Sequence, residues 1–149
     1  GSSNVQLDIY QAETAAHAVK QDLILQEARQ NLARAGSLSA LEFSGAVHAL
    51  QVLVENAIGK SKHWLKALKL PVPVSAYDAF ALLQQKQWIT QQDLAAWQLA
   101  IGLRNRIVHD YLNLDDGVIY HLIQTDAYRF MIDFLNRPIE TNLQKGEEK

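Results

Sequence analysis

The sequence lacks several features that would point to particular classes of protein. It contains no cysteine, which excludes a disulfide framework and any metal site built on thiolates. No stretch is long and apolar enough to cross a membrane, and there is no glycine-rich phosphate loop, internal repeat or low-complexity tract. The formal net charge is only −2, which argues against strong non-specific affinity for nucleic acid.

What is present fits one folded domain. The chain has 149 residues, of which 48% are hydrophobic, enough for a single core. We assign residues 5–141 to this domain, residues 1–4 to an expression scar or a disordered N-terminus, and residues 142–149 to a frayed polar tail. No signal peptide is visible, so a cytoplasmic location is the default expectation.

Apolar residues recur at helical spacing and no alternating strand pattern occurs, so the sequence predicts an all-α fold. Capping sequences open three of the helices, at Ser39–Glu42, Ser75–Asp78 and Thr90–Asp93. Proline ends the second helix at Pro71 and the last helix at Pro138. We therefore expect a mostly up-and-down bundle of about five helices with short connections.

The first helix, from about residue 5 to residue 35, has a seam of apolar residues that step alternately by four and three. This seam is predicted to face the other helices of the bundle. Its members are Val5, Ile9, Ala12, Ala16, Val19 and Leu23.

One stretch near the end of the fourth helix departs from the pattern. The inward seam of this helix passes through Trp97 and Ile101 and then reaches Arg104 and Tyr111. An arginine on an inward seam is costly unless it meets a partner or a ligand. The misfit is therefore the first indication of a site.

Basic residues concentrate around the same stretch. From residue 56 to residue 109 there are seven basic and two acidic residues, so this segment carries +5 and the remainder of the chain −7. A basic region suits a polyanion, although a solvated lysine face would look the same. The candidate residues for binding a polyanion such as a nucleic acid are Arg106, Lys60, Lys62, Lys66 and Lys69.

Arg104, His109 and Tyr111 together match the Arg-x4-His-x-Tyr signature of HepT-like toxins, and residues 103–115, LRNRIVHDYLNLD, resemble the motif segment of that family nearly throughout. These toxins belong to the HEPN superfamily and pair with MNT nucleotidyltransferase antitoxins in type VII-like toxin–antitoxin systems. The resemblance covers most of the chain, and the motif carries its specificity.

The resemblance implies a metal-independent endoribonuclease that acts on transfer RNA or messenger RNA and needs no cofactor. Arg104 and His109 would be the catalytic pair, with Asn105 as the polar residue that orients a water, a phosphate or His109. Tyr111 would be the residue that the MNT partner modifies with AMP, which silences the toxin. The family also forms dimers through the motif helix.

Elementary chemistry agrees with these roles. RNA is cleaved without a metal when a base deprotonates the 2′-hydroxyl and its oxygen attacks the adjacent phosphorus. Histidine titrates near neutral pH and can serve as base or acid. Arginine presents a planar fork to phosphate oxygens. The four remaining histidines, His17, His48, His63 and His121, lack a clear metal-ligand spacing, so no metal site is expected.

Helical geometry adds a condition. On an ideal helix, Arg104 and His109 point about 140° apart, whereas Arg104 and Tyr111 share a face. Either the helix deforms near Val108, or two chains face each other and form a composite cleft. Each motif residue also has a structural explanation: Arg104, for instance, would pair with Asp93, Asp110 or Glu55.

A different function fits the same residues. The chain would then be a non-catalytic HEPN module that binds a nucleotidyltransferase and presents substrate to it, with Tyr111 as the modified group.

Overall fold

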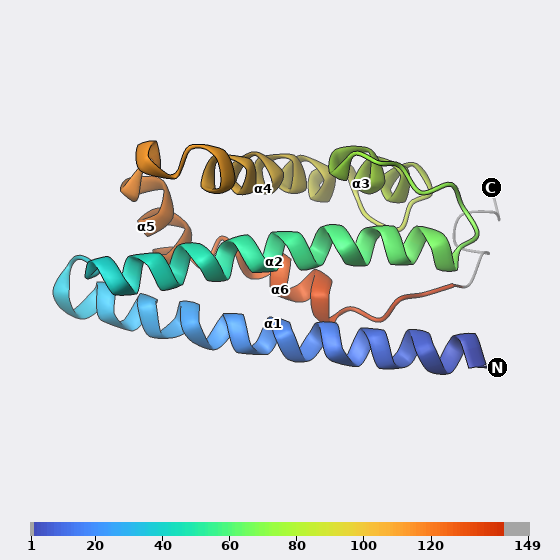
Figure 1. Ribbon diagram of the computed structural model, residues 1–149, viewed down its shortest axis with the longest axis horizontal. Helices are drawn as coiled ribbons and strands as arrows, with labels where there is room; N and C mark the ends of the chain where they lie inside the picture. The colour runs from blue at the N-terminus through green and yellow to red at the C-terminus, as the bar shows by residue number, and fades with distance from the viewer. Residues whose placement is uncertain (1, 142–149) are drawn as a thin grey trace.

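The computed structural model describes residues 2–141, and Gly1 and residues 142–149 lie outside the described part. The described chain is all-helical, which confirms the predicted fold class (Figure 1). It consists of α1 (Ser2–Ala35), α2 (Ala40–Ala67), α3 (Ala76–Gln85), α4 (Gln91–His109), a short 3₁₀ helix η1 (Tyr111–Asn113), α5 (Asp116–Gln124) and α6 (Arg129–Asn136). Residues 2–4, assigned above to a scar or a disordered N-terminus, continue α1.

The helices begin where the capping sequences predict. Ser39 accepts a hydrogen bond from the Glu42 amide and Glu42 returns one to the Ser39 amide, a complete capping box at the start of α2. Thr90 and Asp93 form the same arrangement at α4. These bonds satisfy free amides in the first turn, so each helix start is fixed locally.

The long helices α1 and α2 lie side by side and antiparallel, and α3 and α4 cover the far side of α2 (Figure 1). Helix α6 packs against both α1 and α2. Aromatic rings fill the centre: Trp97 stacks on Phe80 with centroids 4.6 Å apart and meets Phe134 edge-on at 5.2 Å. Buried aromatic contacts of this kind typically contribute ~0.5–1.5 kcal/mol per pair beyond area burial.

The number of helices differs from the prediction of about five. The expected last helix is divided into α5 and α6, because Asp126 adopts a left-handed conformation with φ 57° between them. Arg129 holds this break in place: it donates to both carboxylate oxygens of Asp22 on α1, at 2.7 and 2.9 Å, and to both of Asp126, at 3.1 Å. The turn is thereby fastened to α1.

The predicted inward seam of α1 is wrong. Val5, Ile9, Val19 and Leu23 are all exposed on the outer face of the helix. The side chains of α1 that pack inward belong to a second set with the same alternating spacing, namely Thr14, Ala18, Gln21, Leu25, Ala28 and Leu32. Both sets fit one helix, and the spacing of residues alone does not decide which of them meets α2 and α6.

Candidate functional site

The motif lies at the end of α4, and the helix is regular from Arg104 to His109. Helix α4 runs unbroken to His109 and stops at Asp110, whose φ and ψ are −148° and 43°. The proposed deformation near Val108 is therefore wrong. Tyr111 then starts the 3₁₀ turn, in which the Asn113 amide group donates to the Asp110 carboxylate at 2.8 Å. Because the helix ends first, Tyr111 does not share a helical face with Arg104.

The guanidinium group of Arg104 has few partners in the fold. Its Nη1 lies 4.0 Å from Glu55 Oε2 on α2, so Glu55 is the carboxylate, of the three considered, that pairs with it. Gln51 donates to the same Glu55 oxygen at 3.2 Å. The Nε of Arg104 is buried and has no hydrogen-bond partner among the described residues, although the side chain as a whole remains 25% exposed. A guanidinium with spare donors at the surface is suited to bind an anion.

His109 and Asn105 are both exposed on the outer side of α4, one helical turn apart. On this regular helix Arg104 and His109 point about 140° apart and are separated by about 7.5 Å along the axis. One chain alone thus does not direct both side chains at the same atom of a substrate.

Tyr111 rests against α2 and keeps its ring at the surface. Its hydroxyl lies 3.4 Å from the Ser44 hydroxyl, and 41% of the residue is exposed. The phenolic oxygen is therefore held at the edge of the fold and not in the core, where a second protein can reach it.

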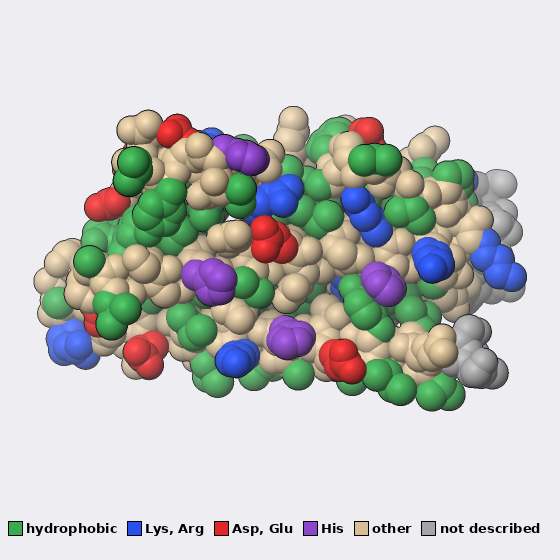
Figure 2. Space-filling view, viewed as in Figure 1, with side chains coloured by type: hydrophobic (Ala, Val, Ile, Leu, Met, Phe, Trp, Pro, Cys, Tyr) green, Lys and Arg blue, Asp and Glu red, His purple; other side chains and the backbone are tan. Residues whose placement is uncertain are grey.

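The sequence interpretation missed the contribution of α2. Ser44, Gln51 and Glu55 are seven and four residues apart, which places them on one face of α2, and they contact or orient the motif residues. In the sequence these three residues form a polar stripe at helical spacing, which is the pattern that could have identified them. Figure 2 shows this side of the molecule, where basic, acidic and histidine side chains gather over α2 and α4.

The four candidate lysines differ in their burial and their hydrogen-bond partners. Lys60 is fully buried and donates to the backbone carbonyls of Phe134 (2.6 Å), Leu135 (3.3 Å) and Arg137 at the end of α6, so its assignment as an RNA-binding residue is wrong. Burial lowers the pKa of Lys60 to about 7, and the Arg137 charge adds to this shift.

The other candidate basic residues remain at or near the surface. Lys66, Lys69 and Arg106 are exposed. Lys62 is partly exposed and donates to the Val74 carbonyl at 2.7 Å.

The described residues contain no group of three or more histidine, aspartate or glutamate side chains that could hold a metal ion. No helix among them is long and apolar enough to span a membrane.

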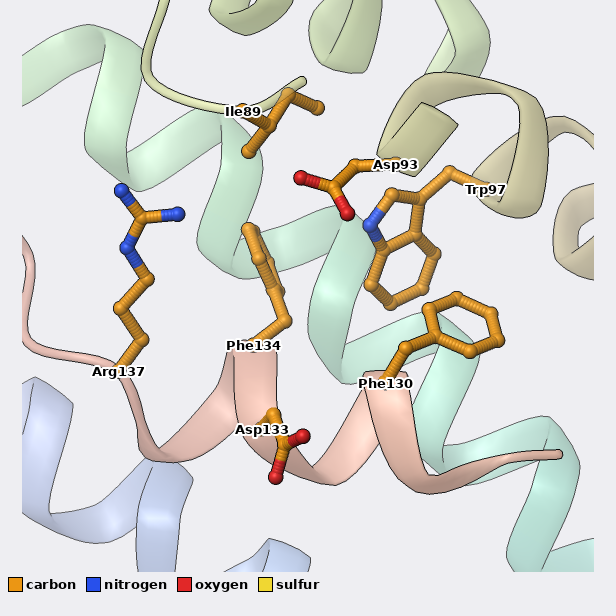
Figure 3. A pocket seen from close by; sticks show the side chains of 7 residues that line it. All are labelled: Ile89, Asp93, Trp97, Phe130, Asp133, Phe134 and Arg137. Atoms are coloured by element: carbon orange, nitrogen blue, oxygen red, sulfur yellow. The ribbon is translucent and has the colours of Figure 1, made fainter. Parts of the chain in front are cut away.

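A small pocket of about 200 Å³ lies between α4 and α6, away from the motif (Figure 3). Two of its polar groups are already engaged, since Asp93 caps α4 and Arg137 lies over the Trp64 ring, 4.9 Å from its centroid. It is therefore a weaker candidate for a site than the surface formed by α2 and the end of α4.

The fold and the motif together define an all-helical chain of the HEPN kind. Residues 15–137 match the family described as Ribonuclease HepT-like, and the chain belongs to this family.

Individual relatives agree with this assignment. The mRNA nuclease HepT of Shewanella oneidensis is 36% identical over 75 residues, which are 50% of this chain and 56% of that protein. The chain therefore matches little more than half the length of this curated relative.

Solved structures of toxin–antitoxin complexes have the same fold. A tri-AMPylated HEPN toxin of Shewanella oneidensis in complex with MNT antitoxin superimposes with a TM-score of 0.73 at 24% identity, covering 85% of this chain and 96% of that one. A mutant of the MntA–HpeT toxin–antitoxin pair gives 0.66 at 26% identity, covering 85% and 96%.

Proposed function

We propose that the chain is the toxin of a toxin–antitoxin pair and cleaves transfer or messenger RNA without a metal ion. The observation that carries the proposal concerns Arg104, a partly exposed motif arginine on the same helix as the exposed His109. Its ion pair with Glu55 is 4.0 Å long, and its Nε has no partner among the described residues. Membership of the HepT-like family and the name of the Shewanella relative, an mRNA nuclease, support it.

The chemistry assigns one role to each side chain. A histidine takes the proton from the 2′-hydroxyl, and that oxygen attacks the adjacent phosphorus. The bond to the 5′-oxygen breaks, and this oxygen receives a proton from an acid. The products are a 2′,3′-cyclic phosphate and a free 5′-hydroxyl. Arg104 stabilises the charge that develops on the phosphate oxygens, His109 transfers a proton, and Asn105 orients the phosphate or a water.

A second copy of the chain completes the cleft. Arg104 and His109 diverge on one regular helix, so Arg104 of one copy and His109 of the other would converge across a two-fold axis. The end of the motif region supports such a contact, because the apolar residues Val108 and Leu112 are exposed there, to 47% and 96%.

The test of the activity is cleavage of total RNA by the purified chain in the presence of EDTA. Wild-type protein should cleave and His109→Ala should not, while His17→Ala, which removes an exposed histidine from α1, should cleave normally. A need for added magnesium would contradict the metal-free mechanism. Absence of cleavage by a folded wild-type chain would favour the non-catalytic HEPN module.

Control would act through Tyr111. The related solved structure holds a tri-AMPylated HEPN toxin with its MNT antitoxin, and the Tyr111 hydroxyl is at the surface beside Ser44. An MNT nucleotidyltransferase would direct the Tyr111 oxygen at the α-phosphate of ATP, with loss of the phenolic proton and release of pyrophosphate. The attached phosphodiester brings about one negative charge to this surface, which would repel the phosphates of RNA.

Tyr111→Phe isolates this step because it removes the acceptor oxygen and keeps the ring. The variant should remain toxic when co-expressed with the antitoxin, whereas Tyr77→Phe, at another exposed tyrosine, should be neutralised like the wild type. Mass spectrometry of the co-expressed wild type should show added units of ~329 Da, the chemical mass of an AMP group. Full neutralisation of Tyr111→Phe would show that binding alone suffices.

A further inference from the structure

The outer face of α1 carries an apolar seam that none of the described residues 2–141 covers. Val5, Ile9, Val19 and Leu23 are each between 51% and 61% exposed, and two alanines, Ala12 and Ala16, are exposed between them. Figure 2 shows hydrophobic side chains along the corresponding edge of the molecule, over α1. Scattered apolar residues at a surface need no explanation, but a continuous seam over five helical turns does.

The spacing of the seam specifies what kind of element fits it. Its residues are separated by four, three, four, three and four positions, a period of about 3.5 residues, which keeps a seam facing a second helix that winds around the first. The inward contacts of α1 use the separate set from Thr14 to Leu32, so the outer seam contributes nothing to the core of its own chain.

The order of side-chain sizes makes the seam complementary to itself. Read in either direction it runs large, large, small, small, large, large. If a second α1 lies antiparallel, Val5 meets Leu23 of the other copy, Ile9 meets Val19, and Ala12 meets Ala16. The alanines then fall at the two-fold axis, where the two helices approach most closely. This is the pattern of an isologous interface.

The flanking charges agree with the same alignment. Glu13 and Lys20 lie along one edge of the seam. In the antiparallel register each Glu13 comes within about 7.5 Å, measured along the axis, of Lys20 of the other copy, so that edge holds two opposite pairs. On the other edge Asp8 meets Asp22 of the other copy, and the Asp22 carboxylate is already paired with Arg129 at 2.7 Å. Arg129 also pairs with Asp126, so a weakened like-charge contact remains on this edge, and the charges favour the alignment on the Glu13–Lys20 edge.

We propose that α1 is a self-association surface, which takes α1 of a second copy of this chain in an antiparallel arrangement. Helices α1 and α4 lie on opposite sides of α2 (Figure 1). The contact therefore leaves the motif surface free. It does not rest on the proposed ribonuclease function, and it stays compatible with a dimer through the motif helix.

The first test is the molecular mass of the full chain by sedimentation equilibrium. Leu23→Asp places a charge in the seam and should lower the mass of the assembly at least two-fold relative to wild type, whatever the motif helix adds. The control Leu41→Asp changes an exposed leucine in the first turn of α2, outside the seam, and should leave the mass unchanged. Equal masses for wild type and Leu23→Asp would overturn the proposal.

The second test fixes the register and uses the absence of native cysteine. Two single-cysteine chains, Ala12→Cys and Ala16→Cys, are purified separately with tags of different length, mixed, and oxidised. The antiparallel pairing predicts that the disulfide between position 12 of one chain and position 16 of the other predominates at least several-fold. Predominance of disulfides between identical positions would mean a parallel or shifted contact and would overturn the proposed arrangement.

Discussion

Lys60 and Arg104 are both basic residues that the fold at least partly buries, and it surrounds them in opposite ways. Lys60 is fully buried, donates to three backbone carbonyls, and lies 5.3 Å from the centroid of the Phe134 ring. Arg104 has one ion pair at 4.0 Å and a buried Nε without a partner among the described residues.

The difference separates a structural cation from a functional one. The carbonyls that Lys60 reaches are those at the C-terminal end of α6, which need donors because the helix supplies none there. Arg104 donates to no such carbonyl among the described residues. A cation that the fold leaves underused at the surface is available for a ligand, whereas one whose donors are all engaged is not.

Replacing Lys60 should have the largest effect on stability. Lys60→Met keeps the volume but leaves the Phe134 and Arg137 carbonyls without their side-chain donor, while Leu135 keeps the Gln11 amide group at 2.9 Å. We therefore expect the free energy of unfolding to fall by about 3 kcal/mol. Urea titration monitored by tryptophan fluorescence measures this. Lys66→Met, at an exposed lysine of the same helix, should change it by less than about 0.5 kcal/mol. If both variants lose the same stability, the structural role of Lys60 is wrong.

The pH dependence of stability should sharpen the contrast. The pKa of Lys60 is lowered to about 7 in the folded chain, so between pH 7 and its ordinary value of 10.5 the unfolded chain binds a proton that the folded chain does not. The contribution of Lys60 to the free energy of unfolding therefore rises with pH in this window, by at most ~1.4 kcal/mol per unit.

Parallel urea titrations of wild type and Lys60→Met from pH 7 to pH 9 measure this slope. The curves should diverge with increasing pH, and parallel curves would show that the lysine stays charged, held by its carbonyl partners.

The smallest effect concerns the ion pair of Arg104. Glu55 competes with a phosphate for the guanidinium, so Glu55→Gln should strengthen RNA binding about two- to five-fold at low salt. Stability should change by less than ~1 kcal/mol because both side chains are substantially exposed. Fluorescence anisotropy with labelled RNA, in a His109→Ala background that prevents cleavage, measures the affinity. Weaker binding would mean that Glu55 holds Arg104 in place for RNA.

The features of the fold that depend on neighbouring residues were predictable. The capping boxes at Ser39 and Thr90 are formed within four residues of chain and appear as expected. The orientation of α1 was not predictable, because its outward and inward sets of residues have the same spacing. Only the packing of α2 and α6 distinguishes the two sets. Lys60 was misjudged for a similar reason, since its partners lie more than seventy residues away.

The candidate site was predictable only in part. The motif residues and their place near the end of the fourth helix were found from the pattern. That the helix ends before Tyr111 was not, since no glycine or proline marks this point. Asp110 leaves the helix and its side chain binds Asn113, which turns Tyr111 toward Ser44. The supporting stripe on α2 contacts the motif across 49 to 67 residues of sequence, and only the folded chain brings these together.

The central claim is that Arg104 serves a ligand and not the fold, and one variant measured in two assays tests it directly. Arg104→Ala should lower the rate of RNA cleavage in EDTA by ~10²–10³-fold while the free energy of unfolding, in the same preparation, changes by less than ~1 kcal/mol. Arg29→Ala, which removes an exposed arginine of α1 outside the motif and the candidate RNA-binding residues, should keep most of the activity. If Arg104→Ala instead loses several kcal/mol of stability and cleaves RNA at the wild-type rate, the account is contradicted.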